Sequence, residues 1–269
     1  MILHTFSTLG CPHLDLDAII ALAARHGIHA LELRAVSGTT ELPDLFAREY
    51  GTPAQLAAHL HRRNIRICSI DTSFSLIGAK DGDREQLIKF VEWADRLDVP
   101  WMRVFDGKRN GASESESIAE AADTLAWWRA ERQRQGWAVD LMMETHGTFV
   151  NTPALQGLFR AAPHVSLLWD AHHTWRKGGE MPFDTWSTVR AHTVHVHVKD
   201  SVNEPTPDGK HPYTYVLPSK GEFPMQPLRE QLSADRFDGF LSLEWERLWH
   251  PQLPELDKAL YTAAQNRWW

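Results

Sequence analysis

The chain repeats one pattern eight times: a short apolar run followed by a longer amphipathic stretch. A buried parallel strand followed by a covering helix gives this pattern, and eight such units close into an α/β barrel. The 269 residues suit a single (β/α)8 TIM barrel, which takes about 250 residues, and no linker-like segment divides residues 1–269. The expected strands are 3–8, 30–34, 65–71, 101–106, 139–144, 165–170, 193–200 and 239–246, and the expected helices are 15–27, 53–64, 82–98, 113–136, 152–161, 182–191, 225–235 and 254–266.

Residues that cap helices stand at several of these boundaries. Asp15 precedes the first helix and Gly27 follows it, as an N-cap and a C-terminal glycine do. Thr52-Pro53 and Thr152-Pro153 place proline in a first helical turn, where it is tolerated. Residues 200–224 form the longest irregular stretch, and a loop of that length is usually functional or disordered.

Composition limits the partners and the compartment that suit this chain. The net charge of −7 disfavours a nucleic-acid partner held by many phosphate contacts. Cys11 and Cys68 are the only cysteines, so no disulfide framework is expected, and the chain is interpreted as reduced and cytoplasmic. The first residues lack the pattern of a secretory signal. No apolar run approaches the ~20 residues that span a bilayer, so no membrane partner is expected.

Four acidic or imidazole residues stand at or near the ends of four separate apolar runs: Glu144, Asp170, His197 and Glu244. If each run is a strand of one parallel barrel, the four side chains meet at one mouth. Active sites of such barrels lie at the carboxyl ends of the strands. The sequence therefore predicts a functional site built from these residues.

Side-chain alternation allows all four residues to point into the barrel. Neighbouring side chains of a strand face opposite sides, and the valines of 193–200 share the outward face. Glu144 shares a face with Met142, and Asp170 shares a face with Leu168. The inward side chains of the last two expected strands are His195, His197, Lys199, Ser242, Glu244 and Glu246.

Three converging carboxylates repel one another unless a cation lies between them. Without a cation, each proton taken up to relieve the repulsion would imply a strongly raised pKa. A divalent metal removes the conflict, and three oxygens with one nitrogen suit Mn2+, Mg2+ or Co2+, while Zn2+ stays open. We therefore expect one divalent metal ion as the cofactor.

The same residues resemble the xylose-isomerase-like TIM barrel superfamily, in particular its sugar phosphate isomerase/epimerase branch. The resemblance covers essentially the whole chain in element order, as one barrel domain over 1–269. Gly221-Glu222-Phe223 resembles a short glycine–acid turn of that branch. The other matching motifs are Met143-Glu144-Thr145-His146, Asp170-Ala171-His172-His173, His195-Val196-His197-Val198-Lys199-Asp200 and Leu243-Glu244-Trp245-Glu246.

The resemblance implies a function and roles for these residues. It implies that Glu144, Asp170, His197 and Glu244 bind one metal ion, and that Glu144 and Glu244 double as the acid/base pair. The implied activity is isomerisation or epimerisation of a sugar or keto-polyol by proton transfer through a metal-bound enediolate, with a hydride shift as the other route. By fold-level analogy, a homo-oligomer is also open.

The expected partner is a small polyhydroxylated substrate, and three residues are candidates to contact it. His173 resembles the family histidine that touches a substrate hydroxyl, and His146 and Lys199 complete the set. For Lys199 a salt bridge to Glu246 or Asp200 is an equal alternative. Structural roles are favoured for a further group, although Glu32 faces inward and could reach substrate. That group is His4, Glu32, Arg34, Asp71, Arg103 and His195.

Three other functions compete with the isomerase reading. A dehydratase acting on a keto-polyol of the inosose type would use the same enediolate to expel a hydroxyl. An apurinic endonuclease of the superfamily needs extra histidines where this chain has Asp71 and Asp106, and Asp208-Gly209-Lys210-His211 has the wrong spacing for its Asp-x-His. A non-catalytic sugar-binding or metal-binding barrel has no need for the two glutamates.

Overall fold

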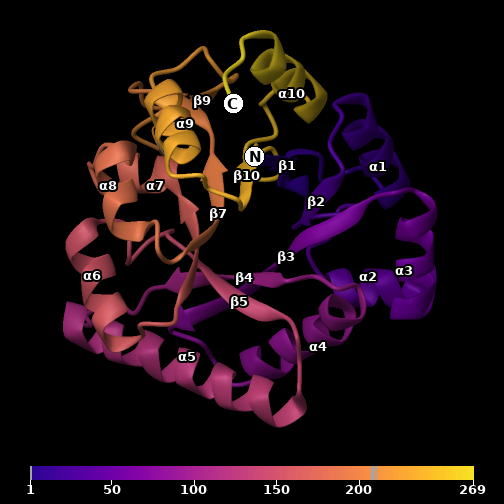
Figure 1. Ribbon diagram of the computed structural model, residues 1–269, viewed down its shortest axis with the longest axis horizontal. Coiled ribbons are helices and arrows are strands. Elements are labelled where there is room, and N and C mark those ends of the chain that lie inside the picture. The colour runs from indigo at the N-terminus through magenta and orange to yellow at the C-terminus, as the bar shows by residue number, and fades with distance from the viewer. Residues whose placement is uncertain (1, 207–208, 210) are drawn as a thin grey trace.

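Eight parallel strands form the centre of the molecule, and helices surround them (Figure 1). This computed structural model describes residues 2–206, 209 and 211–269. The strand order is β1-β10-β7-β6-β5-β4-β3-β2, and a parallel bridge between Ser7 and Glu32 connects the two edges. The ring is therefore nearly closed, and the expected (β/α)8 TIM barrel is confirmed. Its strands are β1 (Leu3–Phe6), β2 (Ala30–Leu33), β3 (Arg66–Ile77), β4 (Trp101–Gly107), β5 (Asp140–Glu144), β6 (Ser166–Asp170), β7 (Thr193–Val198) and β10 (Phe240–Leu243).

The helices pack outside this ring and follow the strands in sequence (Figure 1). None of those in the described ranges is long and apolar enough to cross a bilayer. They are α1 (Leu16–Arg25), α2 (Leu42–Tyr50), α3 (Pro53–Arg62), α4 (Asp83–Arg96), α5 (Glu114–Gln135), α6 (Thr152–Ala161), α7 (Ala171–Arg176), α8 (Pro182–Val189), α9 (Met225–Ala234) and α10 (Leu256–Gln265).

Some elements differ from those expected. Helices α2 and α7 are not among the expected elements, and the six residues of α7 are too few to display a clear helical period. Strand β3 continues past Asp71 to Ile77, and its register with β4 shifts between Asp71 and Ser75. Residues 200–224 contain an antiparallel hairpin of β8 (Asp200–Val202) and β9 (Thr214–Val216).

The capping residues act largely as their positions predict. The Asp15 side chain accepts a hydrogen bond from the Ala18 amide at 2.8 Å, and the Thr52 side chain accepts one from the Gln55 amide at 3.3 Å. At α6, however, the cap is Asn151 and not Thr152, because the Asn151 side chain bonds the Ala154 amide at 3.1 Å.

The outward faces of the strands meet the helices as alternation predicts. Trp169 of β6 stacks on Trp186 of α8 with ring centroids 5.6 Å apart. The two ends of the chain also meet, since the rings of His4 and Trp269 lie 5.0 Å apart. The alternation that sends Trp169 outward leaves Leu168 and Asp170 on the inner face.

Neither cysteine forms a disulfide, and both are buried. Burial raises the pKa of the Cys11 thiol to about 12 and also raises that of Cys68. Because the thiolate is the reactive form, we expect neither cysteine of the folded chain to react with a thiol reagent at pH 8, and both to react in denaturant. Counting the modified thiols by mass spectrometry tests this; rapid labelling of either in the folded chain would contradict it.

Candidate metal centre

Glu144, Asp170, His197 and Glu244 lie together at the carboxyl ends of four barrel strands. Asp170 and His197 are direct partners in the β6–β7 register, and Ser242, two residues before Glu244, is also a partner of His197. All four side chains are buried, and one potential ligand atom of each lies within 4.8 Å of the others. The structure thus brings together all four residues that the sequence selects as metal ligands.

The donor atoms of this cluster suit a divalent cation. Glu144 Oε2, Asp170 Oδ2 and His197 Nδ1 are buried and make no hydrogen bond of regular geometry, although each lies beside a charged side chain. One divalent cation could take these atoms as ligands in place of the contacts that they now make. Carboxylate oxygens with an imidazole nitrogen are ligands that Mn2+, Mg2+ and Zn2+ accept. These residues therefore fit the metal that the sequence predicts.

The charges buried in the described part of the chain are mostly negative. Seven carboxylates are buried there, against three lysine or arginine side chains. Buried carboxylates are stable only when cations or hydrogen-bond donors compensate them. The excess favours a positively charged ligand in the barrel. The acids are Glu32, Asp71, Asp106, Glu144, Asp170, Asp200 and Glu244, and the cations are Arg34, Arg103 and Lys199.

Lys199 partly compensates the cluster from its β7 side. Its Nζ lies 2.7 Å from Asp170 Oδ2, 2.7 Å from Glu246 Oε1, and also contacts Glu244. Burial would raise the pKa of Glu244, but Lys199 and His197 hold that pKa well below its usual value. Of the two salt bridges considered for Lys199, the structure contains the one to Glu246. Asp200 instead accepts backbone amides.

Glu32 orients His197 from the opposite side of the barrel. Both carboxylate oxygens of Glu32 lie 3.0 Å from His197 Nε2, and Glu32 Oε2 also lies 2.7 Å from His195 Nε2. Burial opposes the charge of Glu32, but the two imidazoles hold its pKa well below the usual value. A carboxylate only accepts hydrogen bonds, so His197 Nε2 carries a proton and Nδ1 faces Glu244 at 3.3 Å. Nδ1 is thus the atom of His197 placed to bind a metal.

His173 and His146 lie side by side at the edge of the cluster. His173 is buried, and its Nδ1 lies 3.1 Å from Asp170 Oδ2. Burial holds the pKa of His173 well below its usual value, with Lys199 contributing, so the ring is neutral at pH 7. His146 is exposed, and its ring lies 5.0 Å from that of His173 and 4.8 Å from that of Phe105. His146 is therefore the more accessible of the two.

Asp106 fixes the loop that carries His146. Its carboxylate accepts hydrogen bonds from four consecutive backbone amides, those of residues 146–149, the shortest being 2.7 Å from Thr148 N to Oδ2. The side chain is fully buried at the end of β4. A single carboxylate thus orders the segment that follows β5.

Replacing Asp106 by Ala is expected to destabilise the fold by about 2–3 kcal/mol, because several partly buried amides lose their charged acceptor. Urea unfolding measures the change. Asp106→Asn, which keeps one acceptor oxygen, should lie between the wild type and Asp106→Ala. A fall in the free energy of unfolding below about 0.5 kcal/mol, the usual range for surface substitutions, would contradict the role of Asp106 in ordering this loop.

Asp200 fixes the loop after β7 by accepting backbone amides, as Asp106 does after β5. Its carboxylate accepts the amides of Ser201, Gly221 and Phe223 at 2.9–3.0 Å. A Cβ at Gly221 would lie 2.2 Å from Asp200 Oδ1, so this turn requires glycine. Tyr215 of the hairpin donates to Glu246 Oε1 at 2.8 Å, which brings the hairpin to the partner of Lys199. Asp208 and Lys210, which belong to the segment with the wrong spacing for the endonuclease motif, lie outside the described residues.

Arg34 and Arg103, for which the sequence favours structural roles, both lie beside the cluster. Arg103 Nε is 3.2 Å from Glu144 Oε2, and its guanidinium carbon lies 4.0 Å from the Phe105 ring centroid. In the β4–β5 register, Arg103 and Phe105 are partners of Met142 and Glu144, which share one face. Side-chain alternation along β4 therefore predicts that Arg103 points into the barrel beside Glu144.

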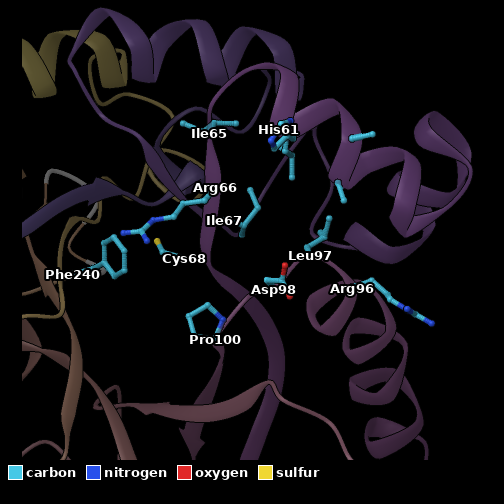
Figure 2. Close-up of a pocket in the computed structure, with 13 residues that line it drawn as sticks. His61, Ile65, Arg66, Ile67, Cys68, Arg96, Leu97, Asp98, Pro100 and Phe240 are labelled. Carbon is cyan, nitrogen blue, oxygen red and sulfur yellow. The ribbon is translucent and has the colours of Figure 1, made fainter.

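A pocket of about 660 Å³ lies at the other end of the barrel. The starts of β3 and β10 line it, and Figure 2 shows Arg66 reaching towards Phe240 beside Cys68 and Pro100. The Arg66 guanidinium carbon lies 5.2 Å from the Phe240 ring centroid. None of the sequence-predicted site residues lines this pocket, and active sites of such barrels form at the opposite end.

Comparisons with solved structures identify the fold. The probable 3-DHS dehydratase AsbF of Bacillus anthracis, involved in petrobactin synthesis, is similar with a TM-score of 0.76, 19% identity, and coverage of 99% of this chain and 100% of that one. The IOLI protein with a bound zinc atom is similar with a TM-score of 0.74 and 16% identity, and the match covers 99% of this chain and 96% of that one. The 3-keto-D-glucoside 4-epimerase YcjR of E. coli is similar with a TM-score of 0.73 and 12% identity, and the match covers 99% of both chains.

Sequence comparison gives the family. No curated protein sequence matches the chain. The sequence model described as "Xylose isomerase-like TIM barrel" matches residues 20–265, which is most of the chain. The motif order, the barrel and this match agree, and the chain belongs to the xylose isomerase-like TIM barrel family.

Proposed function

We propose that this chain is a metal-dependent enzyme that isomerises or epimerises a sugar or keto-polyol by proton transfer. The observation that carries the proposal is the buried cluster of Glu144, Asp170, His197 and Glu244, whose potential ligand atoms lie within 4.8 Å of one another. The similar structures of a 3-keto-D-glucoside 4-epimerase and of a zinc-binding IOLI protein support it. Mn2+, Mg2+ or Co2+ is the favoured ion, with Zn2+ as the alternative.

Glu144 and Glu244 are the proposed bases. They belong to β5 and to the end of β10, with β6 and β7 between these strands, so they approach the cluster from two sides. A divalent ion held by the cluster would supply Lewis-acid polarisation of a substrate carbonyl. One glutamate removes the proton from the carbon next to that carbonyl, which leaves an enediolate. Return of the proton to the other face gives the epimer. Return of the proton to the former carbonyl carbon gives the isomer, provided that the hydroxyl proton of the deprotonated carbon moves to the former carbonyl oxygen.

The remaining polar side chains suit substrate binding. Lys199 and His173 lie against Asp170, and His146 stands at the exposed edge of the same group. Lys199 can donate to a substrate oxygen once it leaves one of its three carboxylate partners. His173 and His146 are placed to contact hydroxyl groups. We propose these three residues as the substrate contacts.

Dehydration of a keto-polyol is the second candidate activity. The same enediolate loses water if a hydroxyl leaves from the carbon beyond it, so the residues need not change. The similarity to the structure of a probable 3-DHS dehydratase, over 99% of this chain, favours this alternative. The two activities are separated by whether the product has lost water.

Metal-dependent turnover in D2O tests the proposal. The protein is stripped with a chelator, reloaded with Mn2+, Mg2+, Co2+ or Zn2+, and incubated with a panel of ketoses and keto-polyols. We expect product only with metal, and deuterium at the carbon that exchanges its proton. Product without deuterium would point to a hydride shift, and absence of turnover by every metal-loaded form would contradict an enzymatic role on these substrates.

A further inference from the structure

Arg34 is a buried cation without an ion-pair partner. It follows β2, and only 5% of its surface is exposed. Nη1 donates to the backbone carbonyl oxygen of Asp71 at 3.3 Å, and Nη2 donates to Ser73 Oγ at 3.1 Å. Within the described residues, no carboxylate oxygen lies within 4.0 Å of its guanidinium. The other two buried cations, Arg103 and Lys199, each contact at least two carboxylates.

The carboxyl group of Asp71 forms no ion pair with Arg34 and instead lies beside Arg103. Asp71 offers Arg34 only its backbone carbonyl. The Asp71 carboxyl group accepts a hydrogen bond from Ser69 Oγ at 2.8 Å and faces Arg103 at 3.7 Å. Burial, and then repulsion from Arg103, lowers the pKa of Arg34 to about 10, so it is charged at pH 7. Asp71, Glu144 and Glu244 stabilise this charge only from a distance. A buried cation without a direct ion pair is costly, and a bound anion would relieve that cost.

The position of Arg34 connects it to the proposed reaction site. Its guanidinium carbon lies 6.0 Å from the centroid of the Phe105 ring, and that of Arg103 lies 4.0 Å from the same ring. Arg103 in turn contacts Glu144. Arg34 therefore stands on the β2–β4 side of the cluster, and Lys199 stands on the β6, β7 and β10 side. A substrate lying across the cluster would present one end to Arg34.

We propose that Arg34 binds a carboxylate of the substrate, so that the enzyme acts on an acidic keto-polyol and not on a neutral sugar. This inference rests on the proposed function. A guanidinium has five donors in a planar fork, and the two recorded contacts leave three of them for the two oxygens of a carboxylate. One negative charge would form the ion pair that Arg34 lacks among the described residues, whereas a phosphate dianion would call for further donors.

Equilibrium binding to matched ligands tests the inference independently of turnover. Mn2+-loaded wild type, Arg34→Gln and Arg34→Lys are titrated calorimetrically with D-fructose, D-fructuronate and D-fructose 6-phosphate, and then with D-tagatose and D-tagaturonate. We expect the wild type to bind at least one carboxylate roughly tenfold to a hundredfold more tightly than its neutral partner. Arg34→Gln should lose this preference, and Arg34→Lys should keep part of it because the charge remains.

Control measurements keep the outcomes distinct. Arg66→Gln removes an arginine at the opposite end of the barrel, so it should keep the carboxylate preference. Equal binding of neutral and carboxylate ligands by the wild type in both pairs, or a preference that survives in Arg34→Gln, would overturn the inference. Tighter binding of the phosphate than of the carboxylate would overturn the choice of a carboxylate.

The failure of this inference can be told apart from failure of the proposed function. Metal-dependent turnover of neutral ketoses that is unchanged in Arg34→Gln would leave the function standing and remove the role of Arg34. An Arg34-dependent carboxylate preference without turnover of any substrate would support Arg34 and contradict the proposed reaction. Thermal unfolding of each variant verifies that the comparison is made on folded protein.

Discussion

Glu244→Gln and Glu144→Gln are each expected to lower turnover by about 10³-fold, which lies within the usual contribution of a general base or acid. Glutamine keeps the size of the side chain but cannot take up a proton. Both positions are buried within the same cluster, where water cannot easily replace the missing base. The measurement is kcat on the substrate that the metal-dependent screen identifies.

Loss of the base must be separated from loss of the metal. The metal content of each variant is therefore measured alongside kcat, and the activity is expressed per bound metal ion. Glu131→Gln is a matched control, because Glu131 lies on the outer helix α5 and pairs with Arg134 there. A variant with full metal content and wild-type kcat at either position would contradict the assigned role.

Exchange of the substrate proton with solvent can show which glutamate starts the reaction. If one glutamate removes the proton and the other returns it, the variant that lacks only the second should still exchange the substrate proton with D2O. The variant that lacks the first glutamate should neither exchange the substrate proton nor form product. Loss of exchange in both variants would mean that each carboxylate is needed for the substrate to bind or react at all.

Much of the barrel and the core of its site could be predicted from sequence, because both depend on short-range patterns. The period of two in 193–200 places His195 and His197 inside, and the structure shows both bonded to Glu32 across the barrel. The ends of the apolar runs place Glu144 and Asp170 at the carboxyl ends of their strands. These features follow from the geometry of a strand and need no knowledge of its neighbours.

Contacts between distant strands could not be predicted in this way. The stagger of the strands decides which inward residues share a layer, and the register shift within β2–β3 and the shift in β3–β4 alter it locally. The position of Lys199 among Asp170, Glu244 and Glu246 depends on this stagger. The positions of Arg34 and Arg103 near the Phe105 ring depend on the same stagger.

The buried charges divide the site into two parts with different tasks. On one side, Lys199 and His173 lie against the carboxylates that are proposed to hold the metal. On the other, Arg103 pairs with Glu144 and Arg34 has no acidic partner among the described residues. A substrate with a keto-polyol end and a carboxylate end matches this division, whereas a neutral sugar would leave the second part without a ligand.

Glu32→Ala is expected to lower the affinity for Mn2+ about 10- to 100-fold, the usual effect of removing a residue that orients a metal ligand. Glu32 is the hydrogen-bond acceptor for Nε2 of both His195 and His197. Without it, His197 loses the bond that keeps Nδ1 directed at Glu244. Because a buried charged pair is also broken, the free energy of unfolding of the metal-free protein should fall by about 3–5 kcal/mol.

Calorimetric titration with Mn2+ and urea unfolding of the metal-free protein measure these two effects of Glu32→Ala separately. Glu32→Gln serves as the matched variant, because its amide oxygen still accepts a hydrogen bond from one imidazole while the negative charge is lost. It should therefore retain more stability than Glu32→Ala and still bind Mn2+ less tightly than the wild type. Wild-type Mn2+ affinity in Glu32→Ala would mean that His197 keeps its orientation without Glu32, and would contradict the role assigned to this carboxylate.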